Sequence, residues 1–261
     1  MSNKADDMAG SAISPLEPSR FIHIASCDST NAEALRLVAH GERGPVWILS
    51  DIQTSGRGRS GRSWSSDPGN FFGSFLSVLP GNPPRAYQIS LVTGVAVAQA
   101  IQALMQNAAG LDLRLKWPND ILAGRSKIGG ILVESTQVAG GGLAVVIGIG
   151  LNLVSHPVDT AQKTDYLASF GAAPDAQAVL SELDHQIGRG LAIWSGRQGF
   201  AEIRSSWLRH SGPLGERLRI NSGAGPVEGT YQGLDQDGAL ILTGDDGNQR
   251  IYSYGDVTLV G

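Results

Sequence analysis

Three arginines and three glycines are interleaved in one short segment, residues 53–64, which reads QTSGRGRSGRSW. Guanidinium groups bind phosphate or carboxylate oxygens through paired N–H donors, and glycine lets backbone N–H groups approach a ligand closely. Trp64, at the end of the segment, is able to cover a flat ring. The segment is typical of a loop that binds an anion, and we call residues 53–64 the arginine–glycine loop.

The arginine–glycine loop also satisfies the pattern GxGxxG of dinucleotide-binding folds. In those folds a helix begins directly after the glycines and receives the pyrophosphate at its N-terminus. Here residues 65–70 read SSDPGN, a run of turn formers, so this interpretation fails. No Gly-Lys-Ser or Gly-Lys-Thr follows the glycines, which excludes a Walker P-loop. An RNA-binding Arg-Gly segment stays open for the loop alone, although the chain has a single such cluster without repeats.

Two further motifs place a lysine next to an apolar strand. The first, KWPND at residues 116–120, has a proline that ends the strand, with Asn119 and Asp120 on the turn beyond it. The second, KIGGILVE at residues 127–134, puts Lys127 at the start of an apolar strand, from which it can point into a pocket. We expect both lysines to join the arginine–glycine loop in one cationic site.

These residues indicate phosphate chemistry rather than nucleophilic catalysis. The sequence has no Ser-His-Asp arrangement, no Cys-His pair and no His/Cys cluster with the spacing of a zinc site. A cationic site without a nucleophile suits an enzyme that positions its substrates and stabilises negative charge on transferring phosphates.

Strands and helices that position these motifs follow one another as in an α+β fold with antiparallel hairpins. Ser29-Thr30-Asn31 supply N-cap side chains for a helix at residues 32–39, and Pro83-Pro84 precede a long helix at residues 85–106. Further helices are predicted at residues 175–195 and 199–210, and strands at residues 21–24, 46–53, 71–79, 112–117, 120–122, 127–136 and 142–153.

From Gly215 onward the pattern changes to five short strands separated by hairpin signals such as Asp237-Gly238 and Asp246-Gly247. Five strands in so short a segment predict a small SH3-like β-barrel. We therefore expect a flexible tail, a main α+β domain with a mixed or antiparallel sheet, and a small SH3-like domain, at residues 1–19, 20–213 and 214–261 respectively.

Composition limits the class of protein. Hydrophobic residues make up 41% and charged residues 17% of the chain, as in an ordinary soluble globular protein. A formal net charge of -4 argues against a general nucleic-acid-binding protein. Cys27 is the single cysteine, which favours a reducing cytoplasm. Residues 1–19 lack the apolar core of a secretory signal, and the apolar stretch at residues 89–105 is interrupted by polar residues, as in a buried helix.

Five motifs, taken together in their order and spacing, resemble those of biotin protein ligases. They are Ser29-Thr30-Asn31, GRGRSGRSW at residues 56–64, KWPND, KIGGILVE, and GIGLN at residues 148–152. The resemblance covers about residues 20 to 261. It implies an enzyme that uses ATP and Mg²⁺ to activate biotin as biotinyl-5′-AMP and then transfers biotin to one lysine of the biotin carboxyl carrier domain of a carboxylase such as acetyl-CoA carboxylase.

The resemblance also implies roles for single residues. Residues expected to bind biotin are Ser29, Thr30, Asn31, Gln53, Gly56, Arg57, Gly58, Arg59, Lys127 and Gly130. Residues expected to bind ATP or the adenylate are Arg57, Arg59, Arg62, Trp64, Lys116, Asn119, Lys127 and Asn152. The expected catalytic residues are Arg59, Lys127, Asp120 and Lys116, with Lys127 at the acyl-phosphate oxygens and Asp120 orienting or deprotonating the carrier lysine. The resemblance names no metal ligand.

DNA repression is not carried over from the family. Members that double as repressors have an N-terminal winged helix-turn-helix, for which the tail at residues 1–19 is too short. We expect a cytoplasmic monomer or homodimer that binds neither DNA nor a membrane. The alternative functions are a lipoate or octanoate transferase of related fold and, from another class, a non-enzymatic nucleic-acid-binding protein.

The arginine–glycine loop is also expected to change its order on binding. Its glycines raise the entropy of the free segment, and Arg57, Arg59 and Arg62 repel one another until an anion gathers them. We expect the empty loop to be mobile and biotin to order it before ATP binds.

Overall fold

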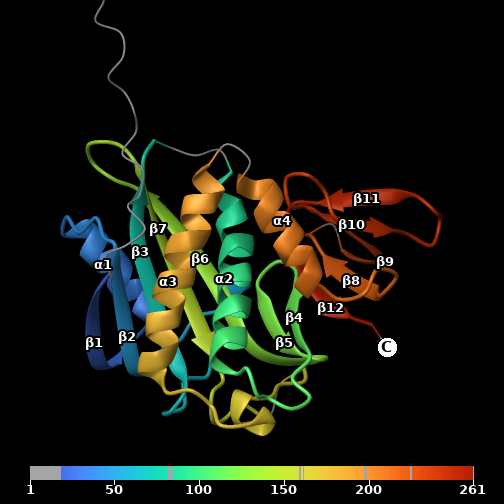
Figure 1. The fold of residues 1–261 in the computed structure, drawn as a ribbon. Helices are drawn as coiled ribbons and strands as arrows, with labels where there is room; N and C mark the ends of the chain where they lie inside the picture. The colour runs from blue at the N-terminus through green and yellow to red at the C-terminus, as the bar shows by residue number, and fades with distance from the viewer. Residues whose placement is uncertain are drawn as a thin grey trace, which may run out of the picture.

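The computed structural model describes residues 19–81, 85–158, 160, 162–196, 199–223 and 225–260. Residues 1–18 of the expected tail and Pro83-Pro84 lie outside the described residues. A seven-stranded sheet with helices on both faces forms the main part of the protein, and a five-stranded sheet lies beside it (Figure 1). This arrangement confirms the predicted α+β fold.

The larger sheet has the strand order β1-β2-β3-β7-β6-β5-β4. It is a mixed sheet, because β1 and β2 are parallel whereas the other neighbouring strands are antiparallel. Its strands overlap those predicted, and they are β1 (Arg20–Cys27), β2 (Val46–Gln53), β3 (Phe71–Leu79), β4 (Leu113–Lys116), β5 (Asp120–Ala123), β6 (Ser126–Gln137) and β7 (Leu143–Leu151).

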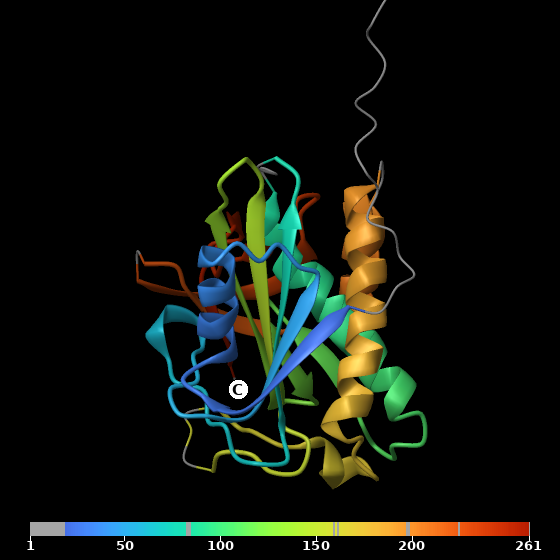
Figure 2. The ribbon, with the colours of Figure 1, turned by 90° about the vertical axis from the view of Figure 1, so that its left-hand side faces the viewer.

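Helices cover both faces of the larger sheet. α2 (Ile89–Leu104) and α3 (Ala176–Ser195) lie side by side on one face, and α1 (Thr30–Ala39) lies on the other (Figure 1 and Figure 2). α2 is apolar on nearly all sides because it packs between the sheet, α3 and α4 (Gly199–His210). Of the helices among the described residues, none is long and apolar enough to cross a membrane.

The start of α1 differs from the prediction. Ser29 is the N-cap residue but makes no side-chain cap bond, and the helix begins at Thr30, two residues earlier than expected. Thr30 and Asn31 are buried, and their side chains bond to strand residues instead of to helix N–H groups. The cap prediction is wrong because these side chains form hydrogen bonds with polar groups of the sheet instead.

The smaller, C-terminal sheet is antiparallel, with the strand order β11-β10-β9-β8-β12. The five short strands predicted after Gly215 are confirmed. They are β8 (Arg217–Asn221), β9 (Pro226–Leu234), β10 (Leu240–Thr243), β11 (Gln249–Tyr252) and β12 (Asp256–Leu259).

Both sheets share one hydrophobic core. Leu218 and Val257 of the C-terminal sheet belong to the same buried cluster as Leu91 of α2. Trp117 Nε1 donates to the backbone oxygen of Gly238 at 3.1 Å, which fixes the turn before β10 against the larger sheet. The apolar surface between the two sheets is thus removed from water, and this burial stabilises both of them together.

Gly238→Ala is expected to lower the free energy of unfolding by about 2–4 kcal/mol. Its new Cβ would lie 2.6 Å from Leu91 Cδ1 and 2.7 Å from Phe200 Cζ, at a φ of +93°. Gly247→Ala is the control, since Gly247 has a φ of +77° but no atom within 4 Å, so backbone strain alone should cost about 1 kcal/mol. Urea unfolding curves measure both values. Equal losses would show that close packing of this turn against α2 and α4 does not constrain residue 238.

Candidate active site

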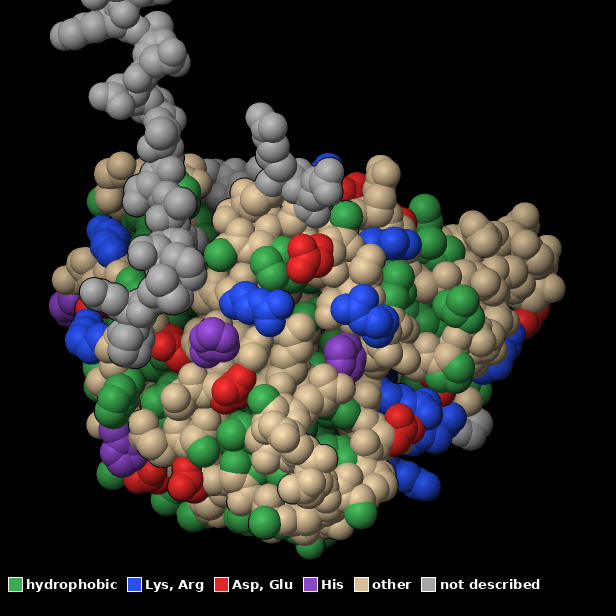
Figure 3. Space-filling view, viewed as in Figure 1, with side chains coloured by type: hydrophobic (Ala, Val, Ile, Leu, Met, Phe, Trp, Pro, Cys, Tyr) green, Lys and Arg blue, Asp and Glu red, His purple; other side chains and the backbone are tan. Residues whose placement is uncertain are grey.

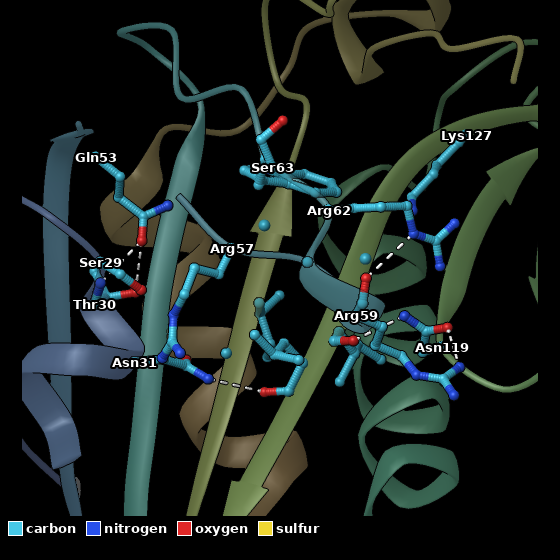
Figure 4. A pocket seen from close by; sticks show the side chains of 18 residues that line it. Ser29, Thr30, Asn31, Gln53, Arg57, Arg59, Arg62, Ser63, Asn119 and Lys127 are labelled. Carbon is cyan, nitrogen blue, oxygen red and sulfur yellow. Dashed lines mark hydrogen bonds between the residues drawn. The ribbon is translucent and has the colours of Figure 1, made fainter. Parts of the chain in front are cut away.

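An open pocket of about 670 Å³ lies between the arginine–glycine loop, the start of α1 and strands β6 and β7 (Figure 4). Figure 4 shows Ser29, Thr30 and Gln53 gathered on one side of it and Arg59, Asn119 and Lys127 on the other. Twelve predicted site residues line the pocket, namely Ser29, Thr30, Asn31, Gln53, Arg57, Gly58, Arg59, Arg62, Trp64, Asn119, Lys127 and Gly130.

Four predicted site residues, Gly56, Lys116, Asp120 and Asn152, are not among those that line the pocket. Six lining residues were not predicted: Ser63, Ile131, Leu132, Gly148, Ile149 and Gly150. The two-residue period of β7 places Gly148 and Gly150 on one face, and two glycines on one face of an apolar strand are a signal of close packing that sequence analysis can use.

A row of hydrogen bonds crosses the first side of the pocket. Gln53 Oε1 accepts from the backbone N–H of Thr30 at 2.9 Å and from its hydroxyl at 3.2 Å. Ser74 Oγ lies 2.7 Å from Thr30 Oγ1 and 2.6 Å from Asn31 Oδ1. Sequence analysis missed Ser74 because it stands within the apolar run of β3. The row holds Thr30 and Gln53 in fixed orientations toward the pocket.

Asn31 uses its side-chain amide within the protein. Its oxygen accepts from Ser74, and its nitrogen donates to the backbone oxygen of Leu132 at 3.2 Å and to Glu134 Oε2 at 2.8 Å. Gly148 makes room for this amide, because a Cβ there would lie 2.2 Å from Asn31 Oδ1. Asn31 therefore links α1 by hydrogen bonds to two strands, β3 and β6, and packs against Gly148 of β7.

The arginine–glycine loop folds into a narrow hairpin. The backbone N–H of Trp64 donates to Gly56 O at 2.9 Å, and that of Gly58 donates to Arg62 O at 2.7 Å. A short 3₁₀ turn at Arg59–Gly61 forms its tip. Gly56 is required at the base, since a Cβ there would lie 2.5 Å from the backbone oxygen of Trp64.

Each arginine of the loop has a partner on another part of the protein. Arg57 Nη2 lies 2.7 Å from Glu134 Oε2 on β6. Arg62 Nη2 lies 2.7 Å from Asp256 Oδ1 on β12, and Arg59 Nη1 donates to Asn119 Oδ1 at 3.1 Å. Arg59 Nη1 also lies 3.9 Å from Asp256 Oδ1, so all three guanidinium groups have a protein carboxylate nearby, which offsets the mutual repulsion of the arginines. The expected mobility of the empty loop stays a prediction.

Asp120 lies behind the pocket and binds two lysines. Its Oδ1 is 2.6 Å from Lys127 Nζ and its Oδ2 is 2.7 Å from Lys116 Nζ. Burial raises the pKa of the Asp120 carboxyl, but the charges of the two lysines outweigh this effect and hold the pKa below its ordinary value. Asp120 is therefore ionised at neutral pH, and it fixes the position of Lys127.

Trp64 and Lys127 contact each other at the other side of the pocket. The Lys127 ammonium lies 5.4 Å from the centroid of the Trp64 ring, as in a cation–π pair. The ring packs closely on Gly150, where a Cβ would come within 2.5 Å of it. Trp64 Nε1 faces Gly150, is buried and has no hydrogen-bond partner among the described residues.

A segment after β7 holds the backbone of Lys127. The backbone N–H of Lys127 donates to Lys163 O at 2.8 Å, and its carbonyl accepts from Asp165 N at 3.0 Å. Asn152, which was expected near the nucleotide, is buried and donates from Nδ2 to the Asp165 carbonyl at 2.9 Å. Asn152 therefore stabilises the segment that positions Lys127.

The described residues contain no group of three or more His, Cys, Asp or Glu side chains that is able to hold a metal ion. Near the pocket, the carboxylates of Asp120 and Glu134 are both engaged by cationic side chains. These donors do not form a protein site for Mg²⁺, which prefers several oxygen ligands.

Comparison with known proteins places this geometry in a family. The biotin/lipoate A/B protein ligase family matches residues 25–152, and the biotin protein ligase C-terminal domain matches residues 214–260. A biotin–[acetyl-CoA-carboxylase] ligase of Paracoccus denitrificans is 38% identical over 240 residues, which cover 87% of this chain and 96% of the relative. The chain belongs to the biotin protein ligase family.

Other biotin protein ligases agree in sequence and in fold. A biotin–[acetyl-CoA-carboxylase] ligase of Mycobacterium tuberculosis is 32% identical and covers 90% of this chain and 86% of its own length. The structure of the biotin protein ligase from Aquifex aeolicus in complex with biotin and ATP superposes with a TM-score of 0.77 at 25% identity, covering 92% of this chain and 99% of that one. The ligase fold therefore extends over both sheets.

Limited trypsin digestion is expected to distinguish the contributions of Asp256 and Glu134, the two carboxylates that hold the arginine–glycine loop. Asp256→Asn should speed cleavage after Arg62 more than after Arg57, and Glu134→Gln should do the reverse, each by about fivefold if one exposed ion pair is lost. In the wild type, biotin should slow cleavage at both arginines, and biotin with ATP should nearly abolish it. Mass spectrometry identifies the cut sites. Equal rates in all three proteins would show that these ion pairs do not hold the loop.

Proposed function

We propose that this protein activates biotin with ATP to form biotinyl-5′-AMP and pyrophosphate, and then transfers the biotinyl group to a lysine of a biotin carboxyl carrier domain. The observation that carries the proposal is a single pocket with a fixed row of hydrogen-bonding groups on one side and Arg59 and Lys127 on the other. The hydrogen-bonding groups are able to recognise a polar ring, and the two cations are able to stabilise phosphate charge. Family membership identifies biotin as the substrate.

The hydrogen-bonded row on α1 and β2 binds the ureido ring and the tail of biotin. Ser29, Thr30 and Gln53 are the residues that carry this role, since each lines the pocket. A buried ureido group needs partners for its donors and its acceptor, and an unmatched group costs about 1–3 kcal/mol. Asn31 contributes indirectly, because its amide is engaged by Ser74, Leu132 and Glu134.

In the first step the biotin carboxylate attacks the α-phosphorus of ATP, and pyrophosphate leaves. Arg57, Gly58 and Arg59 surround the carboxylate and then the adenylate phosphate, with Arg62 and Asn119 beside them, while Trp64 packs on the adenine. Lys127 faces the charge that develops on the phosphate oxygens. Mg²⁺ would accompany ATP and offset negative charge on its phosphates.

In the second step the amine of the carrier lysine attacks the biotinyl carbonyl, an amide forms, AMP leaves, and the proton of the amine passes to solvent in the open pocket. Lys127 stabilises the departing phosphate in this step as well. Asp120 is a weak base, because the two lysines hold its pKa below the ordinary value. Its role is to orient Lys127, and we drop the alternative that it removes the proton from the carrier lysine.

The partner is the carrier domain of a biotin-dependent carboxylase, and the relatives named above favour acetyl-CoA carboxylase. We also propose that the protein acts in the cytoplasm, as a monomer or homodimer, and that it does not bind DNA. Arg62 and Asp256 place the C-terminal sheet next to the pocket, so this sheet is part of the surface that meets the carrier.

Two alternative functions have less support. A lipoate or octanoate transferase would share the fold, and the matching family includes lipoate enzymes, but the relatives above are named as biotin ligases. A nucleic-acid-binding protein would need a broad basic surface, whereas on the face in Figure 3 the basic side chains are scattered among acidic ones.

The first half-reaction is tested by exchange of labelled pyrophosphate into ATP. Exchange is expected only when biotin is present, and lipoate or octanoate should not replace it. Labelled biotin should then appear on a purified carrier domain but not on a version whose acceptor lysine is replaced by arginine. Exchange that depends on lipoate instead would reverse the substrate assignment.

Lys127→Ala is expected to lower kcat of biotin-dependent exchange by about 10²- to 10³-fold and to weaken biotin binding much less, because a fixed charge is lost where phosphate charge develops. Lys163→Ala is the control, since it removes an exposed ammonium nearby but keeps the backbone carbonyl that bonds to Lys127. Weakened biotin binding with normal kcat would contradict the role given to Lys127.

A further inference from the structure

Lys116 is a buried lysine whose ammonium meets three acceptors from three parts of the chain. Its side chain is 8% exposed, and Nζ lies 2.7 Å from Asp120 Oδ2. It also donates to the backbone oxygen of Val257 at 2.9 Å and to Gln162 Oε1 at 3.4 Å. An ammonium has three protons, so this set of acceptors uses all of its donors.

These contacts argue against the role that the family resemblance implies for Lys116. A lysine that binds ATP phosphates needs a free donor directed into the pocket, and Lys116 is not among the residues that line it. Moving the ammonium toward a phosphate would leave the buried carboxylate of Asp120 with one cation fewer, which is costly away from water. Lys116 is therefore best explained as a structural link to the pocket.

The contacts of Lys116 connect the C-terminal sheet to Lys127. Figure 1 shows the C-terminal sheet beside the edge of the larger sheet formed by β4 and β5. Val257 on β12 fixes Lys116 at the end of β4, Lys116 fixes Asp120 at the start of β5, and Asp120 binds Lys127 on β6 at 2.6 Å. Each step is a short polar contact between buried or half-buried groups.

We propose that Lys116 is a positioning residue that transmits the position of β12 through Asp120 to Lys127, and that it does not bind ATP. The inference rests on the proposed function, since Lys127 matters as the group that faces phosphate charge. It also gives the C-terminal sheet a second connection to the site, separate from the ion pair between Arg62 and Asp256.

The same geometry makes the site sensitive to pH in a defined direction. Three cationic groups face Asp120: Lys116 from β4, Lys127 from β6 and Arg59 from the arginine–glycine loop. Burial raises the Asp120 pKa, but the two lysines together lower this pKa by more than burial raises it. Asp120 must be ionised to hold Lys127, so activity is lost as pH falls through this pKa. Removing Lys116 should therefore move the acid limb of the activity profile to higher pH.

The test compares wild type, Lys116→Met and Lys116→Arg in biotin-dependent pyrophosphate exchange. Kinetics are measured against ATP concentration at several pH values. For Lys116→Met we expect kcat to fall by about tenfold or more, the KM for ATP to stay within about threefold, and the acid limb to move to higher pH. Lys116→Arg keeps the charge, so its acid limb should stay in place and its loss of kcat should be smaller.

Arg114→Met is the matched control. Arg114 lies on the same strand, but its guanidinium pairs with Asp112 at 2.6 Å rather than with Asp120. This variant should keep the kcat, the KM for ATP and the acid limb of the wild type. If Lys116→Met does not fold, Lys116→Arg carries the test through its KM and its acid limb.

A rise in the KM for ATP of about tenfold or more in either Lys116 variant, with the acid limb unmoved, would overturn the proposal. It would indicate that Lys116 binds the ATP phosphates. An acid limb that shifts equally in Arg114→Met would overturn it too. Failure of the proposed function is a separate outcome, because the wild-type protein would then show no biotin-dependent exchange at all.

Discussion

An ionised carboxylate that is removed from water needs positive charges beside it, and Asp120 has two lysines. Its two oxygens bind Lys116 and Lys127, so the end of β4, the start of β5 and the start of β6 meet at one carboxyl group. Loss of either lysine would leave a buried charge uncompensated. This requirement explains why the KWPND and KIGGILVE motifs occur together, since the first supplies Asp120 and one cation and the second supplies the other cation.

Close packing on β7 is the second constraint on the site. A side chain at Gly148 would displace the Asn31 amide, and a side chain at Gly150 would displace the Trp64 ring. The two glycines therefore allow α1 and the arginine–glycine loop to approach the same strand from two directions. The width of the pocket is determined as much by these missing side chains as by the polar groups around it.

Local patterns made the elements predictable, whereas pairings between distant segments were not. The spacing of Leu180, Leu183, Ile187 and Leu191 predicts α3, and all four residues are buried. By contrast, Arg62 pairs with Asp256, 194 residues away, and no local pattern relates the two. Ser74 escaped prediction because its strand is mostly apolar. Lys116 was assigned to phosphates because two of its three acceptors, Gln162 and Val257, come from distant segments. Motifs identified which residues gather at the site, but contacts across the fold decide what each one does there.

The carboxylates that pair with Arg57 and Arg62 have a consequence for turnover. A phosphate that binds these arginines replaces Glu134 or Asp256 as the ionic partner, so its net affinity is the difference between two ion pairs and not the full strength of one. In the proposed reaction, Glu134 and Asp256 are still adjacent when pyrophosphate or AMP is formed and would pair with the guanidinium groups again. On this proposal the two carboxylates compete with each anionic product, which would favour rapid release.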